Sequence, residues 1–225
     1  MSKLENKVSI IIPCYNQAHY LAEAIEGALN QTMECEVIVV NDGSTDETDK
    51  VASAYFNRLG GYIKKENEGL SEARNDGIKM ATSEWILPLD ADDIIDRNYV
   101  EQLLKLDSDI RSCYMKEFGD GDREYRFPLE PKHEDFKTGN QIHCASMFRK
   151  KMWEDIGGFD AHISRMGGYE DWDFWYRATK KGYNVKVIPE FLLHYRKHGR
   201  SMVDKAISNH NKILAYILTK DDNKV

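Results

Sequence analysis

The sequence predicts an α/β fold in which a mostly parallel central sheet carries helices on both faces. The first observation is that short apolar runs alternate with segments of helical periodicity up to Asp93, in the order β-α-β-α-β-α-β. The second is that two of these runs stop at acidic residues, and ligands bind beyond the carboxyl ends of strands in such sheets. With 225 residues, 41% of them hydrophobic, the chain is long enough for one substantial core, so we expect a single domain.

Two strand-helix units open the chain. Val8–Pro13 is a β-branched run typical of a buried parallel strand. The apolar residues after it recur at helical spacing, which predicts a helix capped by Asn16 or a near neighbour. Cys35–Val40 is the second strand, and the glycine and small polar residues that follow suit a turn close to a ligand, with Ser44 or Thr45 capping the next helix.

A third unit brings an arginine to the same region. Tyr62–Lys64 is a short strand, and Gly69 precedes a helix whose apolar face places Arg74 beside the buried edge. A guanidinium there can donate to a phosphate or to a base carbonyl. The alternative is a surface ion pair with Asp or Glu, which is the commoner fate of an arginine.

The fourth apolar run, Ile86–Leu89, ends in Asp90, Asp92 and Asp93. In extended chain Asp90 and Asp92 point the same way, and two aligned carboxylates repel each other unless a cation such as Mg²⁺ or Mn²⁺ lies between them. A solvated acidic turn is the alternative for so short a motif. A calcium loop is excluded, because isoleucines stand where it needs an oxygen ligand and a glycine.

The second half of the chain has a different pattern. We expect a short helix at about Asn98–Leu104, then a β-hairpin formed by Ile110–Phe118 and Arg123–Phe127. Pro128–Gly139 reads as a polar loop, and a later helix ends at the Gly-Gly pair that follows Ile156. The aromatic residues that follow Gly168 recur at helical spacing, which favours a helix in the core over a platform for stacking. From Asp204 onward we expect a last helix that packs on the domain or on a partner.

Two further candidates come from this half. Glu170 and Asp171 start a helix after flexible glycines, where they could cap it or act as a general base, and the sequence leaves both open. His194 and His198 flank a basic segment that could cover phosphates, and either histidine could be a metal ligand or a phosphate donor. The structural role is the commoner one for a single histidine.

Composition narrows the classes of function. The net charge of −7 argues against a nucleic-acid partner, and the four scattered cysteines indicate neither a zinc site nor a disulfide framework. The N-terminus lacks a signal-peptide core and no apolar run approaches the roughly 18 residues of a membrane span, so we expect a cytoplasmic protein. Neither G-x-G-x-x-G after the first strand nor a P-loop motif is present.

Taken together, the motifs resemble, in order, those of glycosyltransferase family 2, which has the GT-A fold. The resemblance covers nearly the whole chain, through Val8–Asn16, Val37–Asp46, Asn67–Ile78, Trp85–Asp93, Gly157–Asp160, Gly168–Arg177 and Tyr195–Ser201. It implies one GT-A domain over 1–225, with a Rossmann-like sheet and a small acceptor-side hairpin. Residues 1–93 would bind the nucleotide sugar, 94–203 the acceptor, and 204–225 would form the C-terminal helix and tail.

The resemblance also implies roles for single residues. Asp171, beside Glu170, matches the catalytic base, and Asp90 and Asp92 match the Asp-X-Asp motif that holds Mn²⁺ or Mg²⁺ and the donor. The implied donor site consists of Pro13, Tyr15, Asn16, Asp42, Asn67, Arg74, Asp90 and Ala91, with Pro13, Tyr15 and Asp42 around the base. The implied metal site consists of Asp92, Asp90 and Asp93, with His198 and His194 as further candidates.

The activity so implied is transfer of one sugar, with inversion, from a nucleotide diphosphate sugar, usually UDP-linked, to a hydroxyl. The Q-x-x-R-W motif and membrane helices of processive synthases are missing, which favours a distributive enzyme. We expect the acceptor to be a glycan, a lipid-linked molecule or another hydroxyl compound in bacterial surface polysaccharide or glycoconjugate synthesis. Peripheral contact with the membrane would place the protein at its inner face. The sequence is also compatible with a homo-oligomer. The alternatives are a nucleotide-sugar nucleotidyltransferase, which needs a basic glycine-rich loop after the first strand, and a non-catalytic nucleotide-sugar-binding module.

Overall fold

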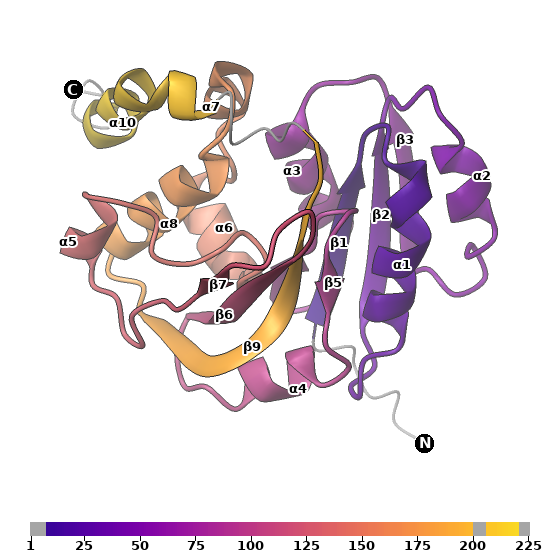
Figure 1. Cartoon of the computed structure of the whole chain (residues 1–225), viewed down its shortest axis with the longest axis horizontal. Coiled ribbons are helices and arrows are strands. Elements are labelled where there is room, and N and C mark those ends of the chain that lie inside the picture. Colours follow the sequence, from indigo (N-terminus) through magenta and orange to yellow (C-terminus); the bar gives the residue numbers. More distant parts are fainter. Residues whose placement is uncertain (1–7, 200–205, 221–225) are drawn as a thin grey trace.

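Four parallel strands form the first half of the sheet, as the apolar runs predict. The computed structural model describes residues 8–199 and 206–220 (Figure 1). The four strands are β1 (Val8–Cys14), β2 (Glu36–Asp42), β3 (Gly61–Lys65) and β4 (Trp85–Pro88), in the spatial order β3-β2-β1-β4. Because all four run the same way, their carboxyl ends meet at one edge, where the acidic residues follow.

Helices cover both faces of these strands. The helices on one face are α1 (Ala18–Leu29), α2 (Thr48–Ser53) and α4 (Tyr99–Leu104), and α3 (Leu70–Met80) lies on the other. Alternate residues of β1 point to opposite faces, so Ile10 packs with α1 whereas Ile11 packs with α3. The predicted α/β fold is therefore confirmed.

The second half of the chain extends the same sheet. Its strands are β5 (Ile94–Ile95), β6 (Ile110–Gly119), β7 (Glu124–Tyr125), β8 (Met147–Arg149) and β9 (Val185–Lys197). β8 joins β4 antiparallel, β6 follows, and the long curved β9 runs parallel to β6 (Figure 1). β7 pairs antiparallel with β6, which confirms the predicted hairpin.

The remaining helices lie on the α3 side of the sheet. They are α5 (His133–Phe136), α6 (Lys150–Ile156), α7 (Ala161–Met166), α8 (Glu170–Lys180) and α10 (His210–Thr219). Trp172, Trp175 and Tyr176 of α8 are all less than 5% exposed, so the aromatic residues are core, as predicted. α10 packs on this face through Ile213 and Ile217.

The structure corrects three local expectations. Strand β4 ends at Pro88, and the Asp93 N–H donates to the Asp90 carbonyl, so the acidic residues form a turn and the argument from strand alternation is wrong. Helix α1 begins after Gln17, whose own side chain does not cap it. Asp46, which follows the expected caps, instead accepts from the Ala18 N–H at the start of α1, and it also accepts from the Thr48 N–H. The polar loop 128–139 contains α5, with Phe136 fully buried.

Some expectations fall outside the described residues. These are the polar N-terminus, the end of the basic segment at residues 200 and 201, and the start and tail of the C-terminal region.

Candidate active site at the carboxyl edge of the sheet

A buried arginine connects the end of β4 to the start of α8. Arg74 is only 1% exposed, and its Nη2 lies 2.6 Å from Asp90 Oδ1 while its Nη1 lies 2.6 Å from Glu170 Oε1. The alternative expected for Arg74, an ion pair with Asp or Glu, is therefore found, but the arginine is buried and not at the surface. Glu170, a candidate catalytic residue, is itself buried and held in this ion pair.

Asp171, the second residue of α8, follows an unusual stretch of backbone. Gly167, Gly168 and Tyr169 have φ angles of 121°, 137° and 70°, a left-handed run that only glycine adopts easily. This run turns the chain so that Asp171 Oδ2 accepts a hydrogen bond of 2.8 Å from Asn140 Nδ2, while Oδ1 accepts one of 2.8 Å from the Trp172 N–H. The carboxylate is therefore fixed through both oxygens.

The surroundings of Asp171 favour its protonated form. Burial, and to a smaller extent the nearby Glu170 charge, raise the pKa of Asp171 to about 7, although Arg74 acts in the opposite direction. A carboxylate with a pKa near 7 is well matched to accept a proton at neutral pH.

The turn after β4 brings Asp92 to the other side of the same edge. Its Oδ2 accepts from Gln17 Nε2 at 2.9 Å and lies 2.8 Å from His198 Nε2. Burial and the neighbouring Asp90 charge raise the pKa of Asp92, while the hydrogen bond to His198 lowers it. Two carboxylates that disfavour each other's charge provide the chemistry that a divalent cation relieves.

The other predicted metal ligands are placed differently. Asp93 is buried, and its Oδ1 accepts from the Arg196 N–H at 2.9 Å; burial and the Asp92 charge raise its pKa well above the usual range. His194 is instead hydrogen-bonded to Asp96, with its Nε2 2.8 Å from Asp96 Oδ1. Asp93 and His194 thus have structural partners, whereas His198 lies with the candidate ligands.

The donor set fits a magnesium or manganese ion that is shared with phosphate oxygens. Among residues 8–199 and 206–220, no three His, Cys, Asp or Glu side chains converge on one point. Mg²⁺ commonly takes one or two protein carboxylates and completes its shell with phosphates and water. Asp90 and Asp92, with His198 beside them, suit that kind of site.

The predicted base-binding residues surround the ends of β1 and β2. Tyr15 is 51% exposed, whereas Pro13 and Ala91 are buried. Asp42 accepts from the Glu68 and Gly69 N–H groups at 3.0 and 2.9 Å, so its carboxylate fixes the loop before α3. The remaining lone pairs of this carboxylate are available to accept hydrogen bonds from the base of a nucleotide.

Asn16 and Asn67 are exposed at this rim and border the turn after β2. Asn16 Oδ1 accepts from the Thr45 N–H at 2.8 Å, which connects the loop after β1 to that turn. A Cβ on Gly43 would lie 2.6 Å from the Asn67 N, so only glycine allows this close approach. The two loops and the start of α3 are thereby held together.

Three contacts of the candidate site were not predicted from the sequence. Gln17 reaches Asp92, Asn140 reaches Asp171, and the Cys144 thiol lies near Arg74 and the Glu170–Asp171 pair, where burial raises its pKa well above the usual range. The partners of Gln17 and Asn140 lie 75 and 31 residues away in sequence. No local motif signals such contacts.

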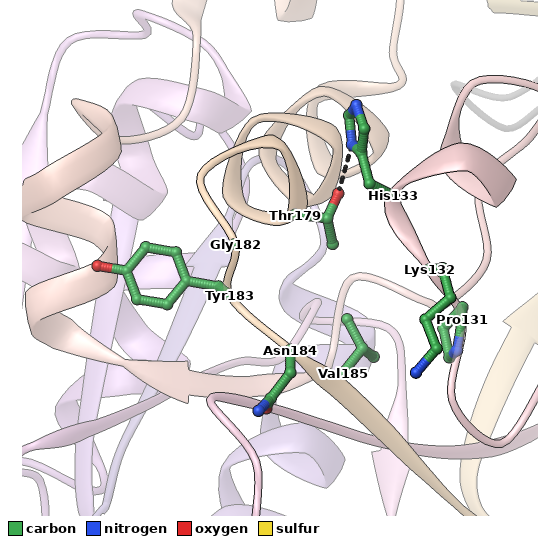
Figure 2. A pocket seen from close by; sticks show the side chains of 8 residues that line it. All are labelled: Pro131, Lys132, His133, Thr179, Gly182, Tyr183, Asn184 and Val185. Atoms are coloured by element: carbon green, nitrogen blue, oxygen red, sulfur yellow. Dashed lines mark hydrogen bonds between the residues drawn. The ribbon is translucent and has the colours of Figure 1, made fainter.

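A separate small cavity lies at the opposite end of α8. It has a volume of about 190 Å³ and is lined by residues of 131–133 and of 179–185. Figure 2 shows His133 facing Thr179, to which it is hydrogen-bonded at 3.1 Å. The lining contains none of the candidate site residues.

No helix within residues 8–199 and 206–220 is long and apolar enough to cross a membrane.

Known proteins resemble the chain in both sequence and structure. EpsH of Bacillus subtilis (strain 168), named as a glycosyltransferase, is 30% identical over 218 residues, which cover 88% of this chain and 63% of EpsH. The structure of S. aureus TarS 1–349 in complex with UDP-GlcNAc superposes with a TM-score of 0.78 at 23% identity, covering 95% of this chain and 66% of that one.

A second solved structure is a mannosyltransferase from Pyrobaculum calidifontis in complex with GDP-Man and Mn²⁺. Its TM-score is 0.71 at 20% identity, covering 97% of this chain and 65% of that one. The chain thus spans just under two thirds of the length of EpsH, of the TarS 1–349 chain and of the mannosyltransferase chain.

Two family descriptions match the sequence itself. Residues 129–201 match the N-terminal domain of galactosyltransferase. Residues 9–157, about two thirds of the chain, match Glycosyl transferase family 2. With the sheet, the acidic turn and the Glu-Asp helix start described above, the chain belongs to glycosyltransferase family 2 and has the GT-A fold.

Proposed function

We propose that the chain is a metal-dependent inverting glycosyltransferase that moves one sugar from a nucleotide diphosphate sugar to a hydroxyl acceptor. The observation that carries this proposal is the Arg74 bridge, which joins Asp90 of the acidic turn to Glu170 at the start of α8. Through it, the element that carries the group suited to receive a proton and the turn that carries the groups suited to hold a diphosphate are directly connected. A non-catalytic binding module would have no need of that arrangement.

Asp171 is the general base of the proposed reaction. The acceptor oxygen attacks the anomeric carbon as the bond from that carbon to the diphosphate oxygen breaks, and the nucleotide diphosphate leaves with the electron pair. Asp171 Oδ2 takes the proton of the acceptor hydroxyl, because its pKa of about 7 lets it be ionised before transfer and protonated after it. One displacement gives inversion.

Asp90 and Asp92 would hold Mn²⁺ or Mg²⁺, with His198 as a further ligand. A divalent ion bound there supplies stabilisation of the negative charge on the departing diphosphate. Arg74 fixes Asp90 by an ion pair, and Gln17 fixes Asp92 by a hydrogen bond, so both carboxylates keep their positions when the donor binds.

The donor is proposed to be a UDP sugar, contacted by Tyr15 and the rim around Asp42. This choice is supported by TarS, whose solved complex contains UDP-GlcNAc, and GDP-Man in the mannosyltransferase complex is the competing donor class. The acceptor is proposed to be a glycan or lipid-linked hydroxyl in bacterial surface polysaccharide or glycoconjugate synthesis, used at the cytoplasmic side of the membrane. A nucleotidyltransferase is disfavoured because Pro13–Asn16 stands where its basic glycine-rich loop is needed.

Thermal stabilisation separates donor binding from transfer. UDP and GDP are added with Mn²⁺, and again with a chelator, to the unaltered chain, Asp92→Ala and Asp171→Asn. We expect Mn²⁺-dependent stabilisation by one nucleotide, which Asp92→Ala loses and Asp171→Asn keeps, because a ligand of the folded state raises its stability by mass action. Release of nucleotide from UDP-GlcNAc or GDP-Man should fall about a hundredfold or more in Asp171→Asn, the typical contribution of a general base.

Two outcomes contradict the proposal. If Asp171→Asn loses nucleotide binding together with turnover, its role is structural. If Asp92→Ala retains unchanged Mn²⁺ dependence, the acidic turn is not the metal site.

A further inference from the structure

Asn140 belongs to a short segment whose position is fixed on both sides. Phe136, which precedes it, is fully buried and its carbonyl accepts from Trp172 Nε1 at 2.6 Å. Gln141 Nε2 donates to the Asp135 and Gly139 carbonyls, and Ile142 is buried. The Asn140 amide is therefore presented to α8 by a rigid segment.

Trp172 links this segment to the candidate base. Its indole donates to the Phe136 carbonyl, and its backbone N–H donates to Asp171 Oδ1 at 2.8 Å. The second carboxylate oxygen, Oδ2, accepts from Asn140 Nδ2 at 2.8 Å. The two donors approach from different elements, so together they fix the plane of the carboxylate.

One atom of Asn140 is left without a partner. Among residues 8–199 and 206–220, Asn140 Oδ1 is buried and accepts no hydrogen bond. A buried amide oxygen without a donor costs free energy, so its retention beside the base calls for a function. A protonated carboxyl group at Asp171 would be such a donor after the amide turns over, because the amide exposes a donor on one side and an acceptor on the other.

We propose that Asn140 is the positioning residue of the base, which donates to the ionised carboxylate of Asp171 before transfer and accepts from its protonated form afterwards. This inference rests on the proposed function of Asp171. In the transfer step the proton of the acceptor hydroxyl moves to Asp171 Oδ2, the acceptor oxygen bonds to the anomeric carbon, and the diphosphate leaves with its electron pair. The Asn140 amide then turns so that its Oδ1 receives the new O–H.

Other charged and titratable groups also face Asp171. They are Glu170 on the same helix, Arg74 of α3, Tyr169 before the helix and Cys144 from the segment that follows Asn140. None of them hydrogen-bonds the Asp171 carboxylate, whereas the Asn140 amide does and favours its ionised form. Removal of the amide donor should therefore move the proton affinity of Asp171 upward.

The test compares Asn140→Leu and Asn140→Asp with a matched control, Gln141→Ala, which removes the neighbouring amide that bonds only backbone carbonyls. The first readout is the pH titration of the Asp171 carboxyl carbon by NMR, identified by its loss in Asp171→Asn. We expect the titration midpoint to rise by about one pH unit in Asn140→Leu, which is a tenfold change in proton affinity. The midpoint should rise further in Asn140→Asp, because a carboxylate replaces the amide, and it should not change in Gln141→Ala.

The second readout is nucleotide release from UDP-GlcNAc or GDP-Man with Mn²⁺, where water serves as acceptor. In Asn140→Leu, kcat at pH 7 should fall about fivefold, because the ionised fraction of Asp171 falls when its titration midpoint rises by one pH unit, and the acid limb of the pH profile should move upward. KM for the donor should stay the same. An unchanged NMR midpoint in Asn140→Leu, or a midpoint moved equally by Gln141→Ala, would overturn the inference. If the unaltered chain releases no nucleotide but the midpoint moves as expected, the contact is upheld and the proposed function fails instead.

Discussion

At the scale of residues, the neighbours Glu170 and Asp171 have opposite electrostatic environments. Glu170 lies against the Arg74 guanidinium, which compensates its charge directly. Within the described part of the chain, the donors to Asp171 are neutral, namely the Asn140 amide and the Trp172 N–H, and the Asp171 carboxylate is repelled by the Glu170 charge. The acidic pair is therefore divided by its surroundings into a permanent ion-pair partner and a group that can take up a proton.

The raised pKa of Asp171 makes the stability of the fold depend on pH. Because its pKa is about 7 in the folded chain and near 3.8 when unfolded, the folded state binds more protons between these values, and the free energy of unfolding falls as pH rises through the window. Asp171→Asn removes that cost. We expect the variant to be more stable than the unaltered chain at pH 8, by up to about 4 kcal/mol for a shift of three units, and the gain to disappear towards pH 4.

Urea unfolding of both proteins at pH 4, 6 and 8 measures this difference. Asp109→Asn is the matched control, since Asp109 directly precedes β6, where its carboxylate accepts from the Asn184 N–H. A gain in Asp171→Asn that is equal at all three pH values would mean that the carboxyl group is not protonated in the folded state near neutral pH.

At the scale of elements, the position of Arg74 depends on how closely α3 packs against the sheet. A Cβ on Gly77 would lie 2.3 Å from Ile11 Cγ2 and 3.1 Å from Val40 Cγ2, so α3 approaches β1 and β2 at a distance that only glycine allows. Gly27 belongs to α1 on the opposite face of the sheet, and a Cβ added there would lie 3.8 Å from its nearest neighbour, the Ile95 carbonyl oxygen. The two helices therefore offer a matched pair of glycines.

Gly77→Ala should lower the free energy of unfolding by about 1–3 kcal/mol, because overpacking outweighs the better helix propensity of alanine. Gly27→Ala should leave stability unchanged or raise it by up to about 1 kcal/mol, the propensity difference alone. Denaturant unfolding of both variants measures the contrast. Equal effects of the two substitutions would show that α3 has room to move away from the sheet, and then Arg74 would not be rigidly held.

The sequence predicts elements better than it predicts the turns between them. The alternation of β-branched runs and helical periodicity is local, so β1 to β4, α1, α3 and the β6–β7 hairpin could be predicted. The conformation of Asp90–Asp93 could not, because it depends on partners such as Gln17 and Arg196, which the turn meets only after folding. The same holds for the cap of α1, which Asp46 supplies from another loop.

At the scale of the whole molecule, the candidate site is built from contacts that are distant in sequence. Arg74 and Glu170 are 96 residues apart, and Asp92 and His198 are 106 residues apart. Recognition of Asp90, Asp92 and Asp171 as candidates was possible from short motifs. The residues that hold these carboxylates in place could not be predicted in the same way. The strand order of the sheet, in which β8 and β6 lie between β4 and β9, is not written in any local motif, and it decides which distant residues meet at the site.

The C-terminal helix adds a last long-range contact, which reaches the start of α8. Lys220 pairs with Asp160 and with Asp173, which is fully buried on α8, and His210 Nδ1 lies 3.3 Å from the Tyr169 hydroxyl, the left-handed residue before Glu170. In Figure 1, α10 lies beside α7, on the side of the molecule away from α1 and α2. The helix therefore helps to hold the strained backbone that aims Asp171.

Lys220→Met should lower the free energy of unfolding by about 1–3 kcal/mol, because it leaves Asp173 buried with one cation fewer, Arg177 remaining as its partner. Lys212→Met, an exposed position on α10, should have almost no effect and is the control. Hydrogen exchange gives the decisive readout, since loosening of α10 should raise exchange in the first turn of α8 as well as in α10 itself. Faster exchange confined to α10 would mean that the glycines and the Arg74 bridge alone hold the start of α8, and that the C-terminal helix only covers the core.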